Sequence, residues 1–104
     1  MTTFSLHQLE QIIAERATAG ADESWTAKLV GMGIEKAAEK MGEEAIESVI
    51  ASLGDKPDNL RDEAADLLYH LLVVLHMKGV SVDAVMDELE RRTGQSGIAE
   101  KASR

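Results

Sequence analysis

The chain has 104 residues, of which 44% are hydrophobic and 29% are charged. This length suffices for one buried core and excludes tandem domains, so we expect a single domain over 1–104 with its core at about 5–93 and a polar tail over 95–104. The absence of cysteine excludes disulfides and cysteine-ligated metals and favours the cytoplasm. A net charge of -8 argues against a nucleic-acid partner, because such binding needs dense Lys and Arg.

The apolar runs of the chain predict neither a secretory signal nor a membrane span. The residues up to Glu10 have no basic segment and no apolar segment of the kind found in signal peptides. The longest unbroken apolar run covers only 71–75, far below the roughly 20 residues that cross a bilayer. We therefore expect a soluble protein without a membrane partner.

Between the glycines, apolar residues recur at three- and four-residue intervals, which predicts an all-α fold. The first helix starts at Ser5, which forms a capping box with Gln8, and runs to Gly20. A polar connection over 21–26 follows.

A short helix comes after this connection. Ser24 or Thr26 caps it, and we expect Gly31 and Gly33 to interrupt it.

Residues 34–53 show the spacing of a long helix with a broad apolar face, and Gly54 ends it. Turn-forming residues then fill 54–59, which predicts a chain reversal with Asp58 or Asn59 as the cap of the next helix. The two long helices should therefore pack as an antiparallel pair.

The next helix covers 60–78 and is apolar almost all round in its second half, a pattern typical of an element that is covered on every side. Gly79 ends it, and Ser81 caps a last helix that ends at Gly94. One small chain rarely covers a helix so completely. We therefore expect an antiparallel bundle of four to five helices that is completed by a homodimer.

Pairs of acids lie on the two longest predicted helices. Glu44 and Glu47 on the first, and Glu63 and Asp66 on the second, are each spaced i, i+3, so each pair lies within a sector of about 60°. The antiparallel arrangement brings the pairs together on a largely buried face. Ionised carboxylates there lose several kcal/mol of hydration each and repel one another. A hard divalent cation, Mg²⁺ or Mn²⁺, would resolve this conflict.

Two alternatives remain open for these acids. They are also compatible with solvated helix faces that form salt bridges along each helix. A di-iron site needs Glu-x-x-His on two helices, and neither pair has histidine at that position. His70, four residues after Asp66, is either a hydrogen-bonded core histidine or a partner of Asp66.

Three lysines are the basic residues nearest to the acids in sequence, namely Lys28, Lys36 and Lys40. Lys36 and Lys40 lie one helical turn apart and are suited either to phosphate contacts or to surface salt bridges. Trp25 is expected in an exposed loop, where it stacks on a base or anchors the loop. Gly42, inside a long helix, permits close approach of a ligand or another helix, although packing alone also explains it.

The residues Glu43-Glu44-x-x-Glu47 and Glu63-x-x-Asp66 resemble the signature of the all-alpha nucleoside triphosphate pyrophosphohydrolase superfamily, in which the acids bind magnesium. Within it, the stretches 24–29, 33–45 and 65–72 look like the phosphoribosyl-ATP pyrophosphohydrolase family of histidine biosynthesis. The resemblance spans about 9–92, and Trp25 departs from it where tyrosine is expected more often.

This resemblance implies a hydrolase that converts 1-(5-phosphoribosyl)-ATP to 1-(5-phosphoribosyl)-AMP and pyrophosphate with Mg²⁺. It implies that the acids are metal ligands, that Glu43 and Glu44 take part in catalysis, and that four basic residues contact phosphate. The metal ligands are Glu44, Glu47, Glu63 and Asp66; the phosphate contacts are Arg16, Lys28, Lys36 and Lys40. We expect a separate phosphoribosyl-AMP cyclohydrolase to perform the next step.

Two other functions remain open at this point. A house-cleaning nucleoside triphosphate pyrophosphohydrolase would show the same acid pattern. A helical dimer that serves only as an interaction module would leave the acids as solvated faces.

Overall fold

The computed structural model describes residues 3–94, and in that part of the chain it contains five α-helices and no strand. The predicted all-α class is confirmed. The helices are α1 (Leu6–Ala17), α2 (Trp25–Met32), α3 (Ile34–Ser52), α4 (Pro57–Met77) and α5 (Val82–Thr93). The predicted tail over 95–104 lies outside the described residues.

The first helix begins with the predicted capping box. Ser5 Oγ accepts a hydrogen bond from the Gln8 amide, and Gln8 Oε1 accepts one of 2.7 Å from the Ser5 amide. The helix ends at Ala17, before the predicted Gly20, because Thr18 already closes it: the Thr18 hydroxyl donates back into the last turn. The start of the helix is thus predicted correctly, and its end is three residues too late.

The short helix α2 is longer than predicted. Ser24 caps it by accepting from the Ala27 amide at 3.1 Å, so Trp25 is its first residue rather than part of a loop. Gly31 lies inside the helix, and the prediction that it interrupts the helix is wrong. Gly33 does separate α2 from α3, with a φ of 96° that side-chain-bearing residues rarely adopt.

The predicted cap of α4 is also wrong. The helix starts at Pro57, and its N-cap is Lys56, which lies two residues before Asp58 and three before Asn59. Proline suits the first helical position because its φ is already helical and its missing N–H would have no partner there. The predicted cap of α5 is confirmed, since Ser81 accepts from the Ala84 amide at 3.0 Å.

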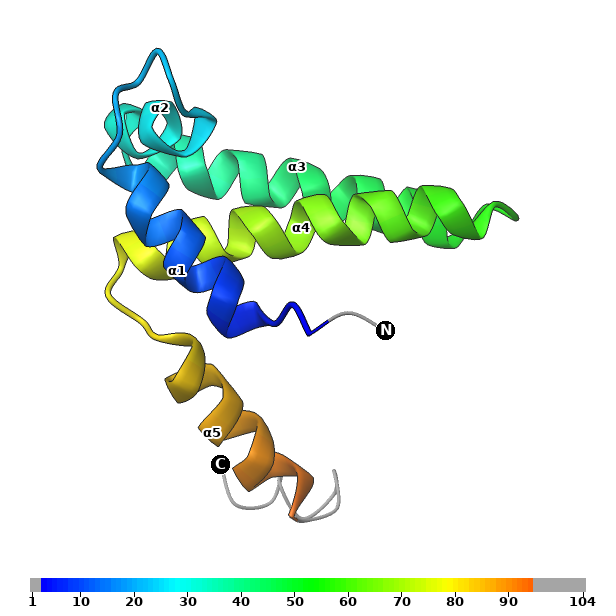
Figure 1. Ribbon diagram of the computed structural model, residues 1–104. Coiled ribbons are helices and arrows are strands. Elements are labelled where there is room, and N and C mark those ends of the chain that lie inside the picture. Colours follow the sequence, from blue (N-terminus) through cyan, green and yellow to red (C-terminus); the bar gives the residue numbers. More distant parts are fainter. Residues whose placement is uncertain (1–2, 95–104) are drawn as a thin grey trace.

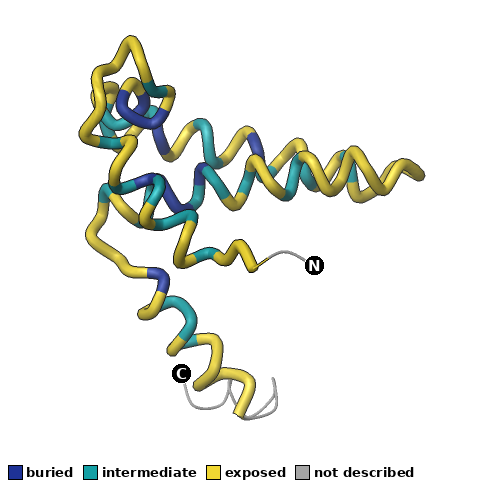
Figure 2. The backbone as a smooth tube through the Cα atoms, in the orientation of Figure 1, coloured by how far each residue is buried: buried dark blue, intermediate teal, exposed yellow. Residues whose placement is uncertain are grey.

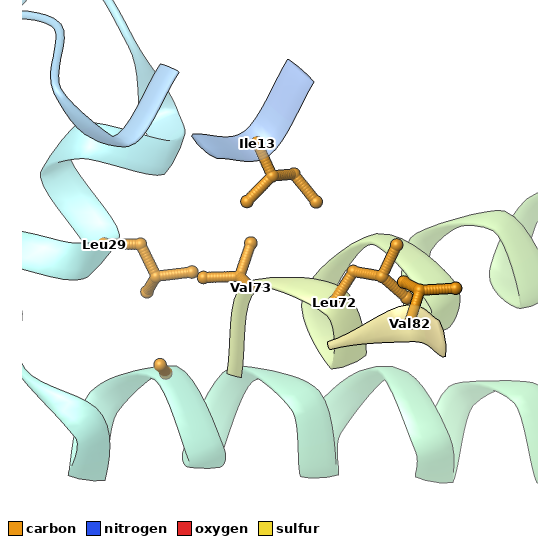
Figure 3. Close-up of a cluster of buried hydrophobic side chains, with 6 residues drawn as sticks. Ile13, Leu29, Leu72, Val73 and Val82 are labelled. Carbon is orange, nitrogen blue, oxygen red and sulfur yellow. The ribbon is translucent and has the colours of Figure 1, made fainter. Parts of the chain in front are cut away.

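The helices α3 and α4 lie side by side as an antiparallel hairpin, with α1 packed across α4 and α2 at the opposite end from the hairpin turn (Figure 1). The core lies where α1, α2, the start of α3 and the second half of α4 meet, and Val82 is the buried residue that α5 contributes (Figure 3). Its buried apolar residues are Ile13, Leu29, Ala37, Leu72, Val73 and Val82. The site described below lies next to this core, on the α3–α4 hairpin.

Much of the predicted apolar face remains exposed in the single chain. On α3, Ile46 is 62% exposed, Ile50 64% and Leu53 83%, and Figure 2 shows exposure along the whole outer half of the hairpin. Leu68 on α4 is 41% exposed. The expectation that α4 is covered on every side is therefore not met by one copy of the chain.

Gly42 lies inside α3 without a packing partner among the residues that the structure describes. Nothing lies within 4 Å of a Cβ built on Gly42, so close packing inside the described chain does not explain this glycine.

Among residues 3–94, no helix alone has the length and apolar character to cross a bilayer. The helices α4 and α5 meet such a criterion only when taken together, and the chain bends by 110° between them.

Candidate active site

The acids predicted from their spacing meet between α3 and α4. Carboxylate oxygens of Glu44 on α3 and of Glu63 and Asp66 on α4 all lie within 4.8 Å of one another. The antiparallel hairpin causes this convergence, since it places the middle of α3 against the first half of α4. We call these three residues the acid cluster.

The expectation that the acids lie on a largely buried face is only partly met, because Glu63 is half-buried and Asp66 is exposed. Glu44 is only 8% exposed, and within the described residues Glu44 Oε2 and Glu63 Oε2 are buried without a hydrogen-bond partner. A buried polar group without a partner costs roughly 1–3 kcal/mol, and more when it is charged. An ionised carboxylate has only acceptor oxygens, so these acids can hydrogen-bond to one another only if one of them carries a proton.

Burial and the close approach of the carboxyl groups also shift the pKa values of the acids. Burial raises the pKa of Glu44 above its ordinary value, and the carboxylates of Glu47 and Asp66 raise it further. The pKa of Glu63 is also raised, first by a hydrogen-bonding contact with the Glu47 carboxyl and then by burial. Glu47 thus adjoins both acids from α3, although it lies outside the group of three. A fully solvated arrangement of these acids does not fit such contacts.

The donor set fits a hard divalent cation. Around one octahedral Mg²⁺, adjacent oxygens lie about 3.0 Å apart and opposite ones about 4.2 Å, so the acid side chains, whose oxygens lie within 4.8 Å of one another, would close around the ion by rotating inward. The two buried oxygens without partners are the kind of group that such an ion satisfies. All donors are oxygens, which suits Mg²⁺ or Mn²⁺ rather than softer metals.

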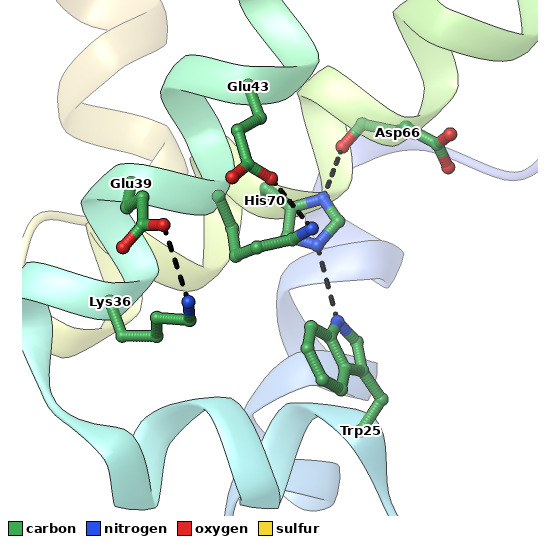
Figure 4. A network of polar contacts seen from close by, with 7 residues as sticks. Trp25, Lys36, Glu39, Glu43, Asp66 and His70 are labelled. Atoms are coloured by element: carbon green, nitrogen blue, oxygen red, sulfur yellow. Dashed lines mark hydrogen bonds and ion pairs between the residues drawn. The ribbon is translucent and has the colours of Figure 1, made fainter.

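Two of the predicted lysines lie on α3, N-terminal to the acid cluster. Lys40 Nζ contacts a Glu43 oxygen at 2.9 Å, and Lys36 Nζ contacts Glu39 at 3.4 Å (Figure 4). The Lys40 pair lowers the pKa of Glu43, and Glu43, with smaller effects of Glu44 and Glu47, raises the pKa of Lys40. Glu43 is therefore engaged by Lys40 and lies outside the acid cluster.

His70 connects α4 to α2. Its Nδ1 donates to the Asp66 backbone carbonyl at 2.8 Å, and its Nε2 accepts from Trp25 Nε1 at 3.3 Å (Figure 4). This pair of bonds requires the neutral ring with the proton on Nδ1. His70 is 8% exposed. It is thus a hydrogen-bonded core histidine, and its contact with Asp66 is to the backbone rather than to the carboxylate.

A second polar pocket lies next to this connection, between the end of α1, the start of α2 and the middle of α4. Its lining includes Arg16, Glu23, Trp25, Thr26 and Tyr69. We call it the α1–α2 pocket. Of these residues, Glu23, Thr26 and Tyr69 were not predicted as site residues, because no motif spacing links them to Arg16. Lys28 lies in the first turn of α2 and is exposed.

The raised pKa of Glu63 predicts how the stability of the metal-free protein depends on pH. The unfolded chain ionises at the ordinary value, so stability falls as the pH rises from about 4.5 towards the folded pKa. Glu63→Gln removes this loss, and its stability advantage over the parent protein should grow across that window and then stay constant. Urea denaturation in EDTA between pH 4 and 7.5 measures it, with Glu90→Gln on exposed α5 as the matched control. A pH-independent difference would contradict the assigned environment of Glu63.

The fold and the acid cluster together define a class of protein. A helical hairpin that gathers acids from both of its helices, next to lysines, is the arrangement of an all-alpha nucleoside triphosphate pyrophosphohydrolase.

Comparison with known proteins identifies the family within this class. The sequence model of the family "Phosphoribosyl-ATP pyrophosphohydrolase" matches residues 6–93. The chain is 61% identical to a phosphoribosyl-ATP pyrophosphatase of Agrobacterium fabrum over 100% of this chain and 97% of the relative. It is 60% identical to the protein of that name from Allorhizobium ampelinum over 100% of both. With that of Methylobacterium nodulans it shares 55% identity over 100% of this chain and 97% of the relative. The chain belongs to the phosphoribosyl-ATP pyrophosphohydrolase family, as its resemblance predicts.

Proposed function

We infer that the chain hydrolyses 1-(5-phosphoribosyl)-ATP to 1-(5-phosphoribosyl)-AMP and pyrophosphate in histidine biosynthesis. Family membership over 6–93 supports this activity. The observation that carries it on the structural side is the convergence of Glu44, Glu63 and Asp66 between the two long helices. This convergence leaves buried acceptor oxygens that need a counter-charge, as a site for a metal-bound polyphosphate requires.

We further propose that the reaction depends on Mg²⁺, with Mn²⁺ as a possible replacement. Glu44, Glu63 and Asp66 would hold the ion, and Glu47, which adjoins both Glu44 and Glu63, would complete the set. When bound, such an ion neutralises triphosphate charge, acidifies or orients the attacking water and stabilises the leaving pyrophosphate.

The chain's own residues have distinct proposed roles around this site. Lys36 and Lys40, one turn apart on α3, would contact the triphosphate. Lys40 supports this role, because Glu44 and Glu47 contribute to raising its pKa; Lys28 on α2 is a further candidate. Glu44 and Glu43 are proposed as the catalytic acids that orient the attacking water. The Lys40 pair keeps Glu43 ionised but makes it a weaker base than an unpaired glutamate, so its role depends on its position beside Glu44.

One assay separates the candidate functions. The purified chain is incubated with 1-(5-phosphoribosyl)-ATP, ATP, dUTP or dCTP in Mg²⁺, with an EDTA control, and pyrophosphate release is followed. We expect fast, EDTA-sensitive release from 1-(5-phosphoribosyl)-ATP alone. Release only from another nucleotide would support house-cleaning activity, and no release from any of them would favour an interaction module.

We also propose that the functional unit is a homodimer. The large apolar side chains on the outer half of the hairpin support this, since exposed apolar area of this extent normally marks an interface. They are Ile46, Val49, Ile50, Leu53 and Leu60, each between 39% and 83% exposed. The cytoplasmic location and the separate cyclohydrolase stay predictions, as does the absence of nucleic-acid and membrane partners.

A charge placed on this surface should dissociate the dimer. Ile50 is 64% exposed on α3, so Ile50→Glu should leave the single chain folded while destabilising its apolar interface. Sedimentation equilibrium at micromolar concentration should give twice 11.3 kDa for the parent protein and 11.3 kDa for the variant. Gln11→Glu, which adds the same charge on an exposed position of α1, should stay dimeric. A monomeric parent protein would refute the proposal.

A further inference from the structure

We propose that the α1–α2 pocket binds the 5-phosphoribosyl group of the substrate, the group that distinguishes 1-(5-phosphoribosyl)-ATP from ATP. Arg16 would bind its phosphate, and Glu23 would accept hydrogen bonds from its ribose hydroxyls. This inference rests on the proposed function, and it adds a specificity subsite that is separate from the acid cluster.

The pocket has the size and composition of a small-ligand site. Its volume is about 310 Å³, at the lower end of the range that such sites occupy. Trp25, 44% exposed, and Tyr69 supply aromatic surface, while Arg16 and Glu23 supply opposite charges. The pocket therefore combines stacking surface with groups that recognise a polar ligand.

Arg16 is positioned to bind a phosphate. Its Nη1 donates to Tyr69 Oη at 3.5 Å, a long contact that uses one of the five N–H donors of the guanidinium. The Tyr69 hydroxyl is held in turn by a hydrogen bond with the Thr26 hydroxyl, and Thr26 is fully buried. The guanidinium thus contacts a tyrosine that is itself hydrogen-bonded, and its planar fork matches phosphate oxygens.

The start of α2 adds to this preference for an anion. Ser24, Trp25 and Thr26 from the first turn of α2 and its cap line the pocket, and a helix N-terminus carries a partial positive charge. The first turn of α2 contains no acidic residue. The dipole and Arg16 therefore favour the same kind of ligand.

The carboxylate of Glu23 indicates which kind of ligand the α1–α2 pocket binds. A carboxylate next to a simple phosphate would repel it, so an acid in the pocket argues against an anion alone. In dinucleotide-binding proteins a carboxylate binds ribose hydroxyls, and in other members of the same fold an arginine accommodates a phosphate on the ribose. An acid and an arginine that line one pocket therefore fit a phosphorylated ribose better than an inorganic anion.

The position of the pocket fits the shape of the proposed substrate. Its two phosphate-bearing arms leave the adenine on different sides, so the second arm needs a subsite apart from the triphosphate. Tyr69 lies three residues after Asp66 on α4, about 4.5 Å further along the helix. Trp25 lines the pocket and is joined through His70 to the Asp66 backbone (Figure 4). The pocket and the acid cluster are thus fixed to adjacent turns of one helix.

The test compares two product-like ligands that lack the triphosphate. Trp25 is the only tryptophan and lines the pocket, so its fluorescence reports binding in EDTA without turnover. We expect 1-(5-phosphoribosyl)-AMP to bind the parent protein at least about 10-fold more tightly than AMP, and Arg16→Gln to reduce this ratio to near one. Loss of a charged hydrogen bond corresponds to about 10- to 100-fold in affinity. Arg61→Gln, exposed on α4 and paired with Asp58 and Asp62, should keep the parent ratio.

Further variants separate the possible outcomes. Arg16→Lys should retain part of the ratio, and Glu23→Gln should lower it without changing AMP affinity. In turnover, Arg16→Gln should raise KM for 1-(5-phosphoribosyl)-ATP by about 10- to 100-fold with kcat within a few-fold. An unchanged ratio in Arg16→Gln, including one produced by an equal loss of affinity for both ligands, would overturn the assignment while hydrolysis itself remained intact. Absence of hydrolysis by the parent protein would instead refute the proposed function.

Discussion

Glu44→Gln should reduce hydrolysis of 1-(5-phosphoribosyl)-ATP by at least about 100-fold, the scale seen when one preorganised electrostatic group is removed from an active site. Glu44 is the most buried member of the acid cluster, and its Oε2 has no hydrogen-bond partner in the described structure. The substitution removes a charge that the proposed ion requires and keeps the shape of the side chain. Pyrophosphate release at saturating Mg²⁺ measures the effect.

The fold should survive this change. In the metal-free protein, burial and then the carboxylates of Glu47 and Asp66 disfavour the charge on Glu44, and a glutamine amide can donate to these carboxylates instead. Helix content by circular dichroism and the melting temperature in EDTA should therefore equal or exceed those of the parent protein. Glu90→Gln, an exposed acid on α5, should keep full activity. Activity near the parent level in both Glu44→Gln and Asp66→Asn would remove the acid cluster from the mechanism.

The helix starts that depend on local chemistry are the part of the fold that the sequence predicts best. Ser5 and Ser81 each cap a helix as expected, and Ser24 is the one of two candidates that caps α2, because a cap involves residues only three positions apart. Gly31 shows the limit of this approach. A glycine inside a helix costs only about 1 kcal/mol, and the burial of Leu29 in the core outweighs that cost, so α2 continues through it.

The two polar sites differ in how far sequence can predict them. The acid cluster follows from i, i+3 spacing on two helices joined by a short turn, so its convergence is nearly a local property. The α1–α2 pocket joins Arg16 to Tyr69, 53 positions away in sequence, and no spacing rule links them. Only the packing of α1 across α4 brings such residues together.

The role of His70, which lies between these two sites, depends on tertiary contacts as well as on helix spacing. Its spacing from Asp66 allows a role as partner of that carboxylate, although its apolar surroundings favour a hydrogen-bonded core histidine. The bond of Nδ1 to the Asp66 carbonyl is a local i to i−4 contact, but the bond from Trp25 crosses from α2. Through these two hydrogen bonds, His70 links Asp66 of the acid cluster to Trp25 of the α1–α2 pocket.

Addition of Mg²⁺ or Mn²⁺ should raise the melting temperature of the parent protein by roughly 10 to 20 °C at 100 times the dissociation constant. An ion that binds only the folded chain adds about 2.7 kcal/mol of stability at that concentration, and 1 kcal/mol shifts the melting temperature of a domain of this size by about 4–8 °C. The effect arises because the folded hairpin gathers carboxylates that the unfolded chain keeps apart. Differential scanning calorimetry across a metal titration measures it, with reversal by EDTA.

The same titration on variants decides whether the acid cluster is responsible. Glu44→Gln and Asp66→Asn should each lose most of the shift, because each removes one of the three acids whose oxygens lie within 4.8 Å. Glu90→Gln should keep it. An equal shift in all variants would mean that the ion stabilises the acidic chain by general screening. No shift in the parent protein would mean that the carboxylates repel one another without a metal to offset the repulsion.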